Sequence, residues 1–202
     1  MEDRKKPNDS QRIHTRLRKK FNLITNITSI SIVLAIILIV FTSVQFNHTL
    51  KSYGFIQGDI GKAMTVFADS RSALRAVIGY LDAGSISEQQ EIYFDKRDSF
   101  TAYFNSITEQ CNYSEAKKLC DNINSVIDDY WTLSDEIIRQ GATSDVNASN
   151  NAQRLEINEL TPEYDTIYGY MKQLMDCYVT KGNANKRQLN IIEFVCIAVI
   201  LL

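Results

Sequence analysis

Arg71 is the residue of this 202-residue chain that most clearly indicates a binding site, because it is a charged residue at an apolar position. Apolar side chains recur at alternating intervals of four and three across Ile60–Leu81, and Arg71 fills the position between Phe67 and Leu74. A guanidinium group in an apolar core is strongly unfavourable unless it meets a carboxylate or an anionic ligand. Arg75 follows one helical turn later on the same side. The two arginines therefore predict an ion pair or an anion-binding site.

Three hydroxyl-bearing residues, Tyr130, Thr161 and Tyr164, are expected in the layer of the two arginines. Counting residues from the end of each predicted helix places them there. Pro162 has no N–H and interrupts helical hydrogen bonding beside Thr161, which leaves backbone groups free. Arginines, hydroxyls and free backbone groups together suit a small carboxylate, such as an amino acid or an organic acid. These three residues and the two arginines are our candidate ligand-binding residues.

A purely structural role for the arginines is the alternative. Arg71 or Arg75 would then pair with Asp69, Asp98 or Asp129, either inside the chain or across a dimer interface. For Arg71 the residue pattern favours neither alternative. For Arg75 it slightly favours the ion pair.

Catalytic and metal sites find no support in the residue pattern, and no cofactor is expected. The chain contains no G-x-x-x-x-G-K-[ST], G-x-S-x-G or H-E-x-x-H motif. No C-x-x-C pair is present, and the histidines are only His14 and His48. Cys111 and Cys120 flank a predicted turn between two helices and could form a disulfide if they lie outside the cell.

Charge is unevenly distributed along the chain. Residues 1–20 contain eight basic and three acidic side chains, whereas residues 21–50 contain none of either kind. The centre of the uncharged stretch, ISIVLAIILIVFTSV, belongs to a predicted transmembrane helix over residues 21–45. A cleaved signal peptide is the alternative, disfavoured because the apolar run is long and no small-residue cleavage site follows. The basic tail, residues 1–20, is expected in the cytoplasm.

A second apolar run, LNIIEFVCIAVILL, covers residues 189–202. We interpret it as the start of a second membrane helix that is cut off by the end of the sequence. The alternative is a complete protein whose hydrophobic last helix packs on itself. Residues 46–188 carry 14 basic and 20 acidic side chains and are expected to form an extracytoplasmic domain of a multi-pass protein in the cell membrane. A net charge of −2 gives no reason to expect nucleic-acid binding.

The fold class expected for the outer domain is all-α. Only 2 prolines and 8 glycines occur in 202 residues, which favours long helices over a turn-rich β fold. Hydrophobic spacing predicts four helices, centred on Ile60–Leu81, Tyr93–Ile107, Ala116–Ile137 and Leu160–Tyr178. Alternating steps of three and four are typical of an antiparallel up-down four-helix bundle, here placed outside the membrane between two transmembrane helices.

Local signals predict where these helices begin and end. Ser85 and Glu88 fit a capping box at the start of the second helix, and Ser114 is a plausible N-cap of the third. The polar stretch Ala142–Asn151 is expected to be a loop. Pro162 predicts that the fourth helix either begins a second time or is kinked.

The first helix also carries a stripe of small side chains, which predicts a parallel homodimer through this face. The alternative is a wide stripe that faces the core of the same chain. The residues of the stripe are Ala63, Val66, Ser70, Ala73 and Val77.

The order of these segments resembles the sensory half of a bacterial methyl-accepting chemotaxis receptor. Such a protein has a basic tail, a membrane helix, a four-helix outer bundle and a second membrane helix. The stretch Tyr53–Tyr80, YGFIQGDIGKAMTVFADSRSALRAVIGY, is similar to the first sensor helix of these receptors. The resemblance implies a sensor that binds a small anion outside the cell and transmits a helix shift to a cytoplasmic signalling domain. Similar bundles also precede histidine kinases and cyclic-dinucleotide enzymes, and a ligand-free coiled-coil spacer is a further alternative.

By this resemblance, Arg71, Arg75 and Thr161 match residues that hold the amino acid in the family's aspartate and serine receptors. The chain departs from the pattern by lacking a third arginine on the first helix and by placing Thr161 before Pro162. An organic acid is therefore as good an expected ligand as an amino acid.

Overall fold

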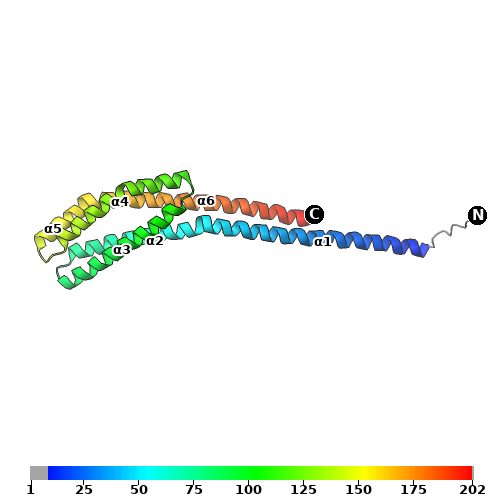
Figure 1. The fold of residues 1–202 in the computed structure, drawn as a ribbon, viewed down its shortest axis with the longest axis horizontal. Coiled ribbons are helices and arrows are strands. Elements are labelled where there is room, and N and C mark those ends of the chain that lie inside the picture. Colours follow the sequence, from blue (N-terminus) through cyan, green and yellow to red (C-terminus); the bar gives the residue numbers. More distant parts are fainter. Residues whose placement is uncertain (1–8, 202) are drawn as a thin grey trace, which may run out of the picture. The chain divides into compact units, whose positions relative to one another are not determined.

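The computed structural model describes residues 9–201, and within this range the chain is helical except at three short turns, residues 80–82, 111–113 and 142–145. No strand occurs in the described part, so the prediction of an all-α chain is confirmed. Two π-helical turns, η1 (Leu50–Gly54) and η2 (Glu156–Leu160), join successive helices without a break. The helices are α1 (Asp9–Thr49), α2 (Phe55–Gly79), α3 (Ala83–Gln110), α4 (Ser114–Gly141), α5 (Val146–Leu155) and α6 (Thr161–Leu201) (Figure 1).

The chain forms two compact units. The first unit runs up to His48 and resumes at Lys186, so it contains most of α1 and the last part of α6. The second unit, Thr49–Asn185, contains the remaining helices and all of the candidate site residues.

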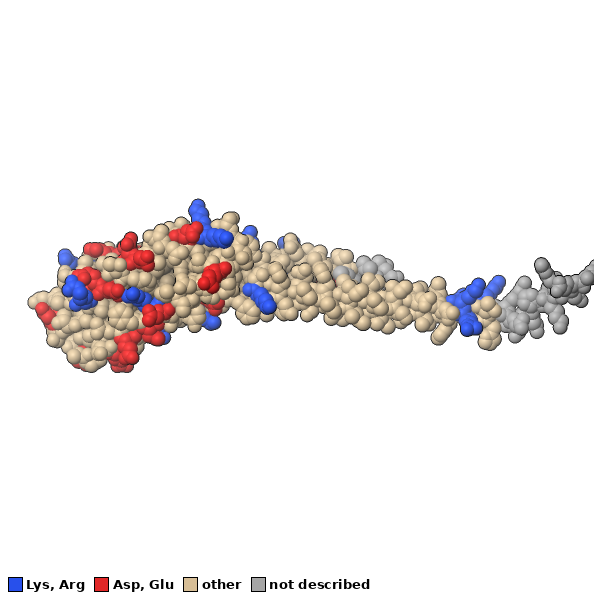
Figure 2. Space-filling model, in the orientation of Figure 1, with Lys and Arg blue, Asp and Glu red and all other residues tan. Residues whose placement is uncertain are grey.

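Within the described residues, one helix is long and apolar enough to span a membrane. It runs over Ile13–Gly79 when α1, η1 and α2 are taken together, and its most apolar 18-residue window has a mean hydropathy of 2.7. None of that window is buried. In Figure 2 this part of α1 presents an uncharged surface that follows a group of Lys and Arg side chains. The predicted basic tail (1–20) and second span (189–202) each lie partly outside the described residues.

The core of the second unit is centred on Phe67 of α2, which is fully buried. Its ring lies 5.0 Å from Phe100 of α3, 5.0 Å from Tyr130 of α4 and 4.9 Å from Tyr164 of α6, measured between centroids. Trp131 of α4 meets the same ring edge-on at 5.7 Å. Side chains of α2, α3, α4 and α6 therefore meet in one aromatic cluster, which holds the helices around the candidate site.

Each predicted helix has an apolar seam, which is the row of apolar residues spaced three and four apart. The residues of these seams are largely buried. Leu81 is an exception at 53% exposed, because α2 ends at Gly79 and no longer directs this side chain inward. Buried members of the seams include Ile60, Phe67, Leu74 and Ile78 in α2, Ile123, Tyr130 and Ile137 in α4, Leu160 in η2, and Ile167, Met171, Leu174 and Tyr178 in α6.

The small-residue stripe of α2 faces the interior of the chain's own fold. Ala63, Ser70, Ala73 and Val77 are buried within one chain, and only Val66 is partly exposed. This burial agrees with the alternative expectation, a stripe that faces the core of the same chain, because small side chains let neighbouring helices approach α2 closely. The homodimer itself stays a prediction, without this stripe to support it.

Three local predictions need correction. The N-cap of α3 is Asp82, whose carboxylate accepts a hydrogen bond from the Ser85 N–H at 2.9 Å, so Ser85 is not the cap of a Ser85–Glu88 box. Tyr113 holds the N-cap position of α4, and Ser114 is its first residue. The predicted loop Ala142–Asn151 is shorter than expected, because α5 begins at Val146 after the Asp145 cap.

At Pro162 the chain stays helical, because α5, η2 and α6 follow one another without a gap. The π-helical turn η2 ends immediately before Thr161, whose backbone N–H donates to the carbonyl of Glu156, five residues earlier. The hydroxyl of Thr161 donates to the same carbonyl at 2.9 Å. Proline has no N–H, and its ring crowds the carbonyl four residues earlier in an α-helix, so a wider turn at this point lets the helix continue.

Candidate functional site

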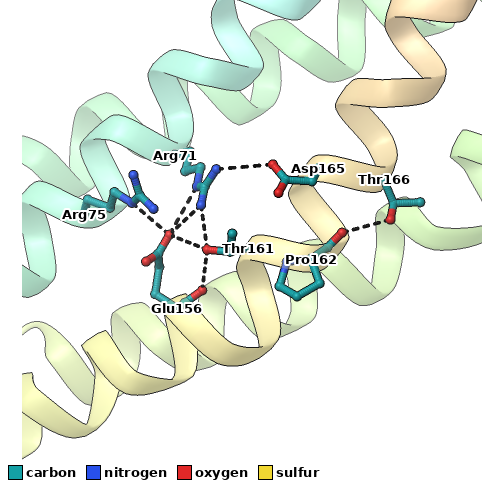
Figure 3. Close-up of polar contacts among 7 residues, drawn as sticks. All are labelled: Arg71, Arg75, Glu156, Thr161, Pro162, Asp165 and Thr166. Carbon is teal, nitrogen blue, oxygen red and sulfur yellow. Dashed lines mark hydrogen bonds and ion pairs between the residues drawn. The ribbon is translucent and has the colours of Figure 1, made fainter.

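Arg71 of α2 lies against the start of α6, with a side chain that is 12% exposed. Its Nε and Nη2 atoms lie 3.2 and 3.1 Å from Oε1 of Glu156, and its Nη2 donates to the Thr161 hydroxyl at 2.6 Å (Figure 3). The guanidinium also stacks over the Tyr164 ring, with Cζ 4.1 Å from the centroid. Three of the predicted site residues, Arg71, Thr161 and Tyr164, are therefore in direct contact.

Arg75 shares the same carboxylate oxygen. Its Nε donates to Oε1 of Glu156 at 2.8 Å, although the Arg75 side chain is 52% exposed. Its terminal nitrogens form no hydrogen bond with any residue that the structure describes. The predicted arginine pair thus converges on one atom, with Arg71 held inside and Arg75 reaching in from the surface.

Glu156 is the residue that the sequence analysis missed. It is 3% exposed and lies in η2, one turn before Thr161. The carboxylates paired with Arg71 are Glu156 and, at 4.0 Å, the exposed Asp165, rather than Asp69, Asp98 or Asp129. A signal for Glu156 was present: it lies four residues before Leu160 and four after Ala152, at an apolar position of the seam. A glutamate in a core position is the natural complement of an arginine in one.

Tyr130 belongs to the aromatic cluster and makes no polar contact with the arginines. Its ring packs on Phe67, and its hydroxyl is buried without a hydrogen-bond partner among the described residues. Burial raises the pKa of Tyr130, and burial also raises the pKa of Tyr164, so both phenols stay neutral. Tyr130 therefore contributes to the site only through the aromatic cluster around Phe67, whereas the Tyr164 ring contacts Arg71 directly.

The arrangement is one that recognises carboxylates. Two guanidinium groups and a hydroxyl surround one carboxylate oxygen, and charge-assisted hydrogen bonds of this kind are stronger than neutral ones. The charges of Arg71, Arg75 and Glu156 sum to one positive unit, which Asp165, 70% exposed and 4.0 Å from Arg71, balances. Within the described residues, the two arginines are therefore paired with the chain's own carboxylates.

Comparison with protein-family models, with curated proteins and with solved structures finds no match to this chain. Within the described part of the chain, no three His, Cys, Asp or Glu side chains are grouped so that they could hold a metal ion. The candidate site of this chain is therefore the arginine layer, which consists of Arg71, Arg75, Glu156, Thr161 and Tyr164.

Glu163, directly after Pro162, is an acid in an unfavourable place. Its Oε2 atom is buried without a hydrogen-bond partner among the described residues. Burial, and then repulsion by Asp129 and Glu159, raise the pKa of Glu163 above its ordinary value. An acid with a raised pKa in the folded state opposes folding when ionised, and this penalty disappears as the pH falls through the folded-state pKa.

We therefore expect Glu163→Gln to increase the free energy of unfolding at pH 7, with a gain that shrinks toward pH 3. Urea unfolding of the full chain in detergent, followed by the fluorescence of Trp131, measures this, because Trp131 is the only tryptophan. Glu136→Gln is a control of opposite sign, since hydrogen bonds from Arg139 and Gln140 lower the pKa of Glu136 to about 2. A gain from Glu163→Gln that is equal at both pH values would contradict the prediction.

Proposed function

We propose that the chain is the sensory part of a membrane receptor of the methyl-accepting chemotaxis type, which binds a small anion at the arginine layer. In this proposal the second unit is an antiparallel up-down four-helix bundle outside the membrane, between two transmembrane helices. The uncharged stretch of residues 21–50 and the meeting of four helices around Phe67 support this arrangement.

One observation carries the proposed anion site: Arg71, Arg75 and Thr161 converge on Oε1 of Glu156. The side chain of Glu156 presents to them the same group that an amino acid or organic acid would present. A ligand carboxylate could take over these donors, and the terminal nitrogens of the half-exposed Arg75 offer it a first contact from solvent. Glu156 and the exposed Asp165 offset the two arginines, so in this proposal an anion binds by replacing a carboxylate of the chain.

The position of the site gives binding a route to a signal. Glu156 lies in η2 and Thr161 is the first residue of α6, a helix that continues to Leu201 without a break. A ligand that replaces the Glu156 carboxylate changes the contacts that hold the start of α6. Such a ligand shifts the equilibrium between two arrangements of α6 only to the extent that it binds one arrangement more tightly than the other.

A ligand-free membrane-anchored spacer is the second candidate, and one observation favours it. Glu156 already neutralises Arg71 inside the chain, which is what a purely structural ion pair requires. In that case the arginine layer fixes the register between α2 and the start of α6 and binds nothing.

Calorimetric titration of the full chain in detergent separates the two candidates. L-aspartate, L-serine, succinate and acetate serve as probes, and we expect saturable binding of at least one of them. Arg75→Gln should weaken that binding about tenfold or more, because a charge-assisted hydrogen bond contributes about 1.5–3 kcal/mol. Arg75 is suited to this test because its side chain is half exposed, so its loss should leave the fold intact.

Two further variants complete the titration. Arg71→Ala should abolish binding, whereas Arg154→Gln, at an exposed arginine of α5, should leave the affinity unchanged. Unchanged affinity in both Arg71→Ala and Arg75→Gln would place the ligand elsewhere. The absence of saturable binding for every probe would favour the spacer.

A further inference from the structure

Residues of α4 and α6 and the C-cap residue of α3 meet at one sulfur atom beside the turn between α3 and α4. Cys111 is the C-cap of α3, and its Sγ lies 3.3 Å from Sγ of Cys120 in α4. Tyr178 of α6 donates its hydroxyl to Cys111 Sγ at 3.5 Å. Cys111 and Cys120 are free thiols, 4% and 1% exposed, so the disulfide considered from the sequence is not formed in this structure.

The geometry of the two thiols is nevertheless that of a pair that can join. A disulfide bond measures about 2.05 Å, so the sulfur atoms need to approach by only about 1.3 Å. Cys111 has an extended backbone at the end of α3, with φ −65° and ψ 109°, and its N–H donates to the carbonyl of Thr108 at 3.3 Å. The third described cysteine, Cys177, has Glu115 Oε2 as its polar neighbour at 3.8 Å, so the short sulfur contact is specific to one pair.

The two thiols also differ in acidity. The hydrogen bond with the Cys120 thiol is the largest cause that lowers the pKa of Cys111, to about 6, and the Tyr178 hydroxyl and Lys117 act in the same direction. The pKa of Cys120 is raised, so this thiol keeps its proton and is the donor of the pair. Since the thiolate is the nucleophile in disulfide exchange, Cys111 is the residue that reacts first.

We propose that Cys111 and Cys120 form a dithiol–disulfide pair that is oxidised by exchange with a small disulfide compound. The Cys111 thiolate attacks one sulfur of the compound, whose S–S bond breaks and releases one thiolate. Cys120 then loses its proton and attacks the Cys111 sulfur, which releases the second thiolate. Two protein thiols are oxidised to a disulfide, and the compound is reduced to two thiols.

Oxidation changes the contact that α6 makes with this turn. In the reduced state the Tyr178 hydroxyl donates to a sulfur with thiolate character, and a disulfide sulfur is a weaker acceptor. The Tyr178 ring also packs edge-on against Tyr113, the residue before α4, with centroids 5.8 Å apart. The pair thus gives α6 a redox-dependent contact that is independent of the arginine layer and of the proposed anion site.

Peptide mapping of the full chain in detergent tests the pair. The purified protein is reduced, incubated with excess oxidised glutathione, blocked with an alkylating agent and digested with trypsin without reduction. Trypsin cuts after Lys117 and Lys118, so the two cysteines fall on separate peptides, 98–117 and 119–139. We expect these peptides to be recovered as one disulfide-linked species, with near-complete loss of both alkylated forms.

Single-cysteine variants identify the order of the steps. Cys120→Ser should stop the reaction at a mixed disulfide of glutathione on Cys111, whereas Cys111→Ser should leave Cys120 alkylated. Cys177→Ser is the control and should retain the linked species. Recovery of both cysteines of the unsubstituted chain in alkylated form, or a link from Cys111 to Cys177, would overturn the proposal.

Discussion

Replacing Glu156 with alanine is expected to lower the free energy of unfolding of the second unit by about 3–5 kcal/mol, because it leaves a buried arginine without its carboxylate. Arg71 is 12% exposed, and its remaining acidic neighbour, Asp165, is 70% exposed at 4.0 Å. Urea unfolding of the full chain in detergent, followed by Trp131 fluorescence, measures the change, since Trp131 is part of the aromatic cluster beside the site.

Glu159→Ala is the matched control for this variant. Glu159 lies in the same π-helical turn and is exposed, so its loss is expected to change the stability by less than about 0.5 kcal/mol. The double variant Arg71→Leu, Glu156→Leu should recover much of the loss, because a buried ion pair contributes little relative to apolar residues of similar size. A Glu156→Ala variant as stable as Glu159→Ala would show that the carboxylate does not neutralise Arg71.

Replacing Phe67 with alanine is expected to cost about 3–5 kcal/mol of unfolding free energy, since it opens a cavity where side chains of four helices meet. The ring is fully buried and contacts Phe100, Tyr130, Trp131 and Tyr164. Loss of this ring also removes the stacking partner of Tyr164, on which Arg71 lies. The same fluorescence-detected urea unfolding gives the magnitude, and near-ultraviolet circular dichroism reports the loss of ordered aromatic packing.

Phe55→Ala provides the comparison within the same helix. Phe55 is the first residue of α2 and is 56% exposed, so its removal is expected to cost less than about 0.5 kcal/mol. Equal costs for the two phenylalanines would mean that Phe67 is not the centre of the core.

The hydrophobic spacing predicted the helices well because burial on one face of a helix requires steps of three and four residues. Phe67, Leu74, Ile123 and Ile167 are buried for this reason. The same spacing could not tell whether the second apolar face of α2 also packs within the chain. Ala63 and its stripe are compatible with a dimer partner or with close helix packing, and only the three-dimensional arrangement decides between them.

The candidate site was partly predictable. Counting residues from the turns brought Arg71, Thr161 and Tyr164 together, since α2 and α6 are long helices with a constant rise per residue. The count placed Asp98 and Asp129 in this layer, whereas the carboxylate that Arg71 meets belongs to Glu156 in the π-helical turn one turn before Thr161. The predicted N-cap of α3 was wrong for another reason. Asp82 and Ser85 are both good capping residues, and the sequence does not decide between them.

The π-helical turn η2 also fixes the rotational phase of α6. A hydrogen bond that reaches back five residues encloses one residue more than the bond of an α-helix, and one residue corresponds to about 100° around the helix axis. Each side chain after Leu160 is therefore rotated by about that angle from where an uninterrupted continuation of α5 would place it. If η2 were α-helical with its length unchanged, Thr161 would be turned by about 100° away from Arg71, whereas an α-helical turn with one residue deleted would leave Thr161 facing Arg71. The wider turn therefore takes up one additional residue and keeps the Thr161 face of α6 directed at the arginines.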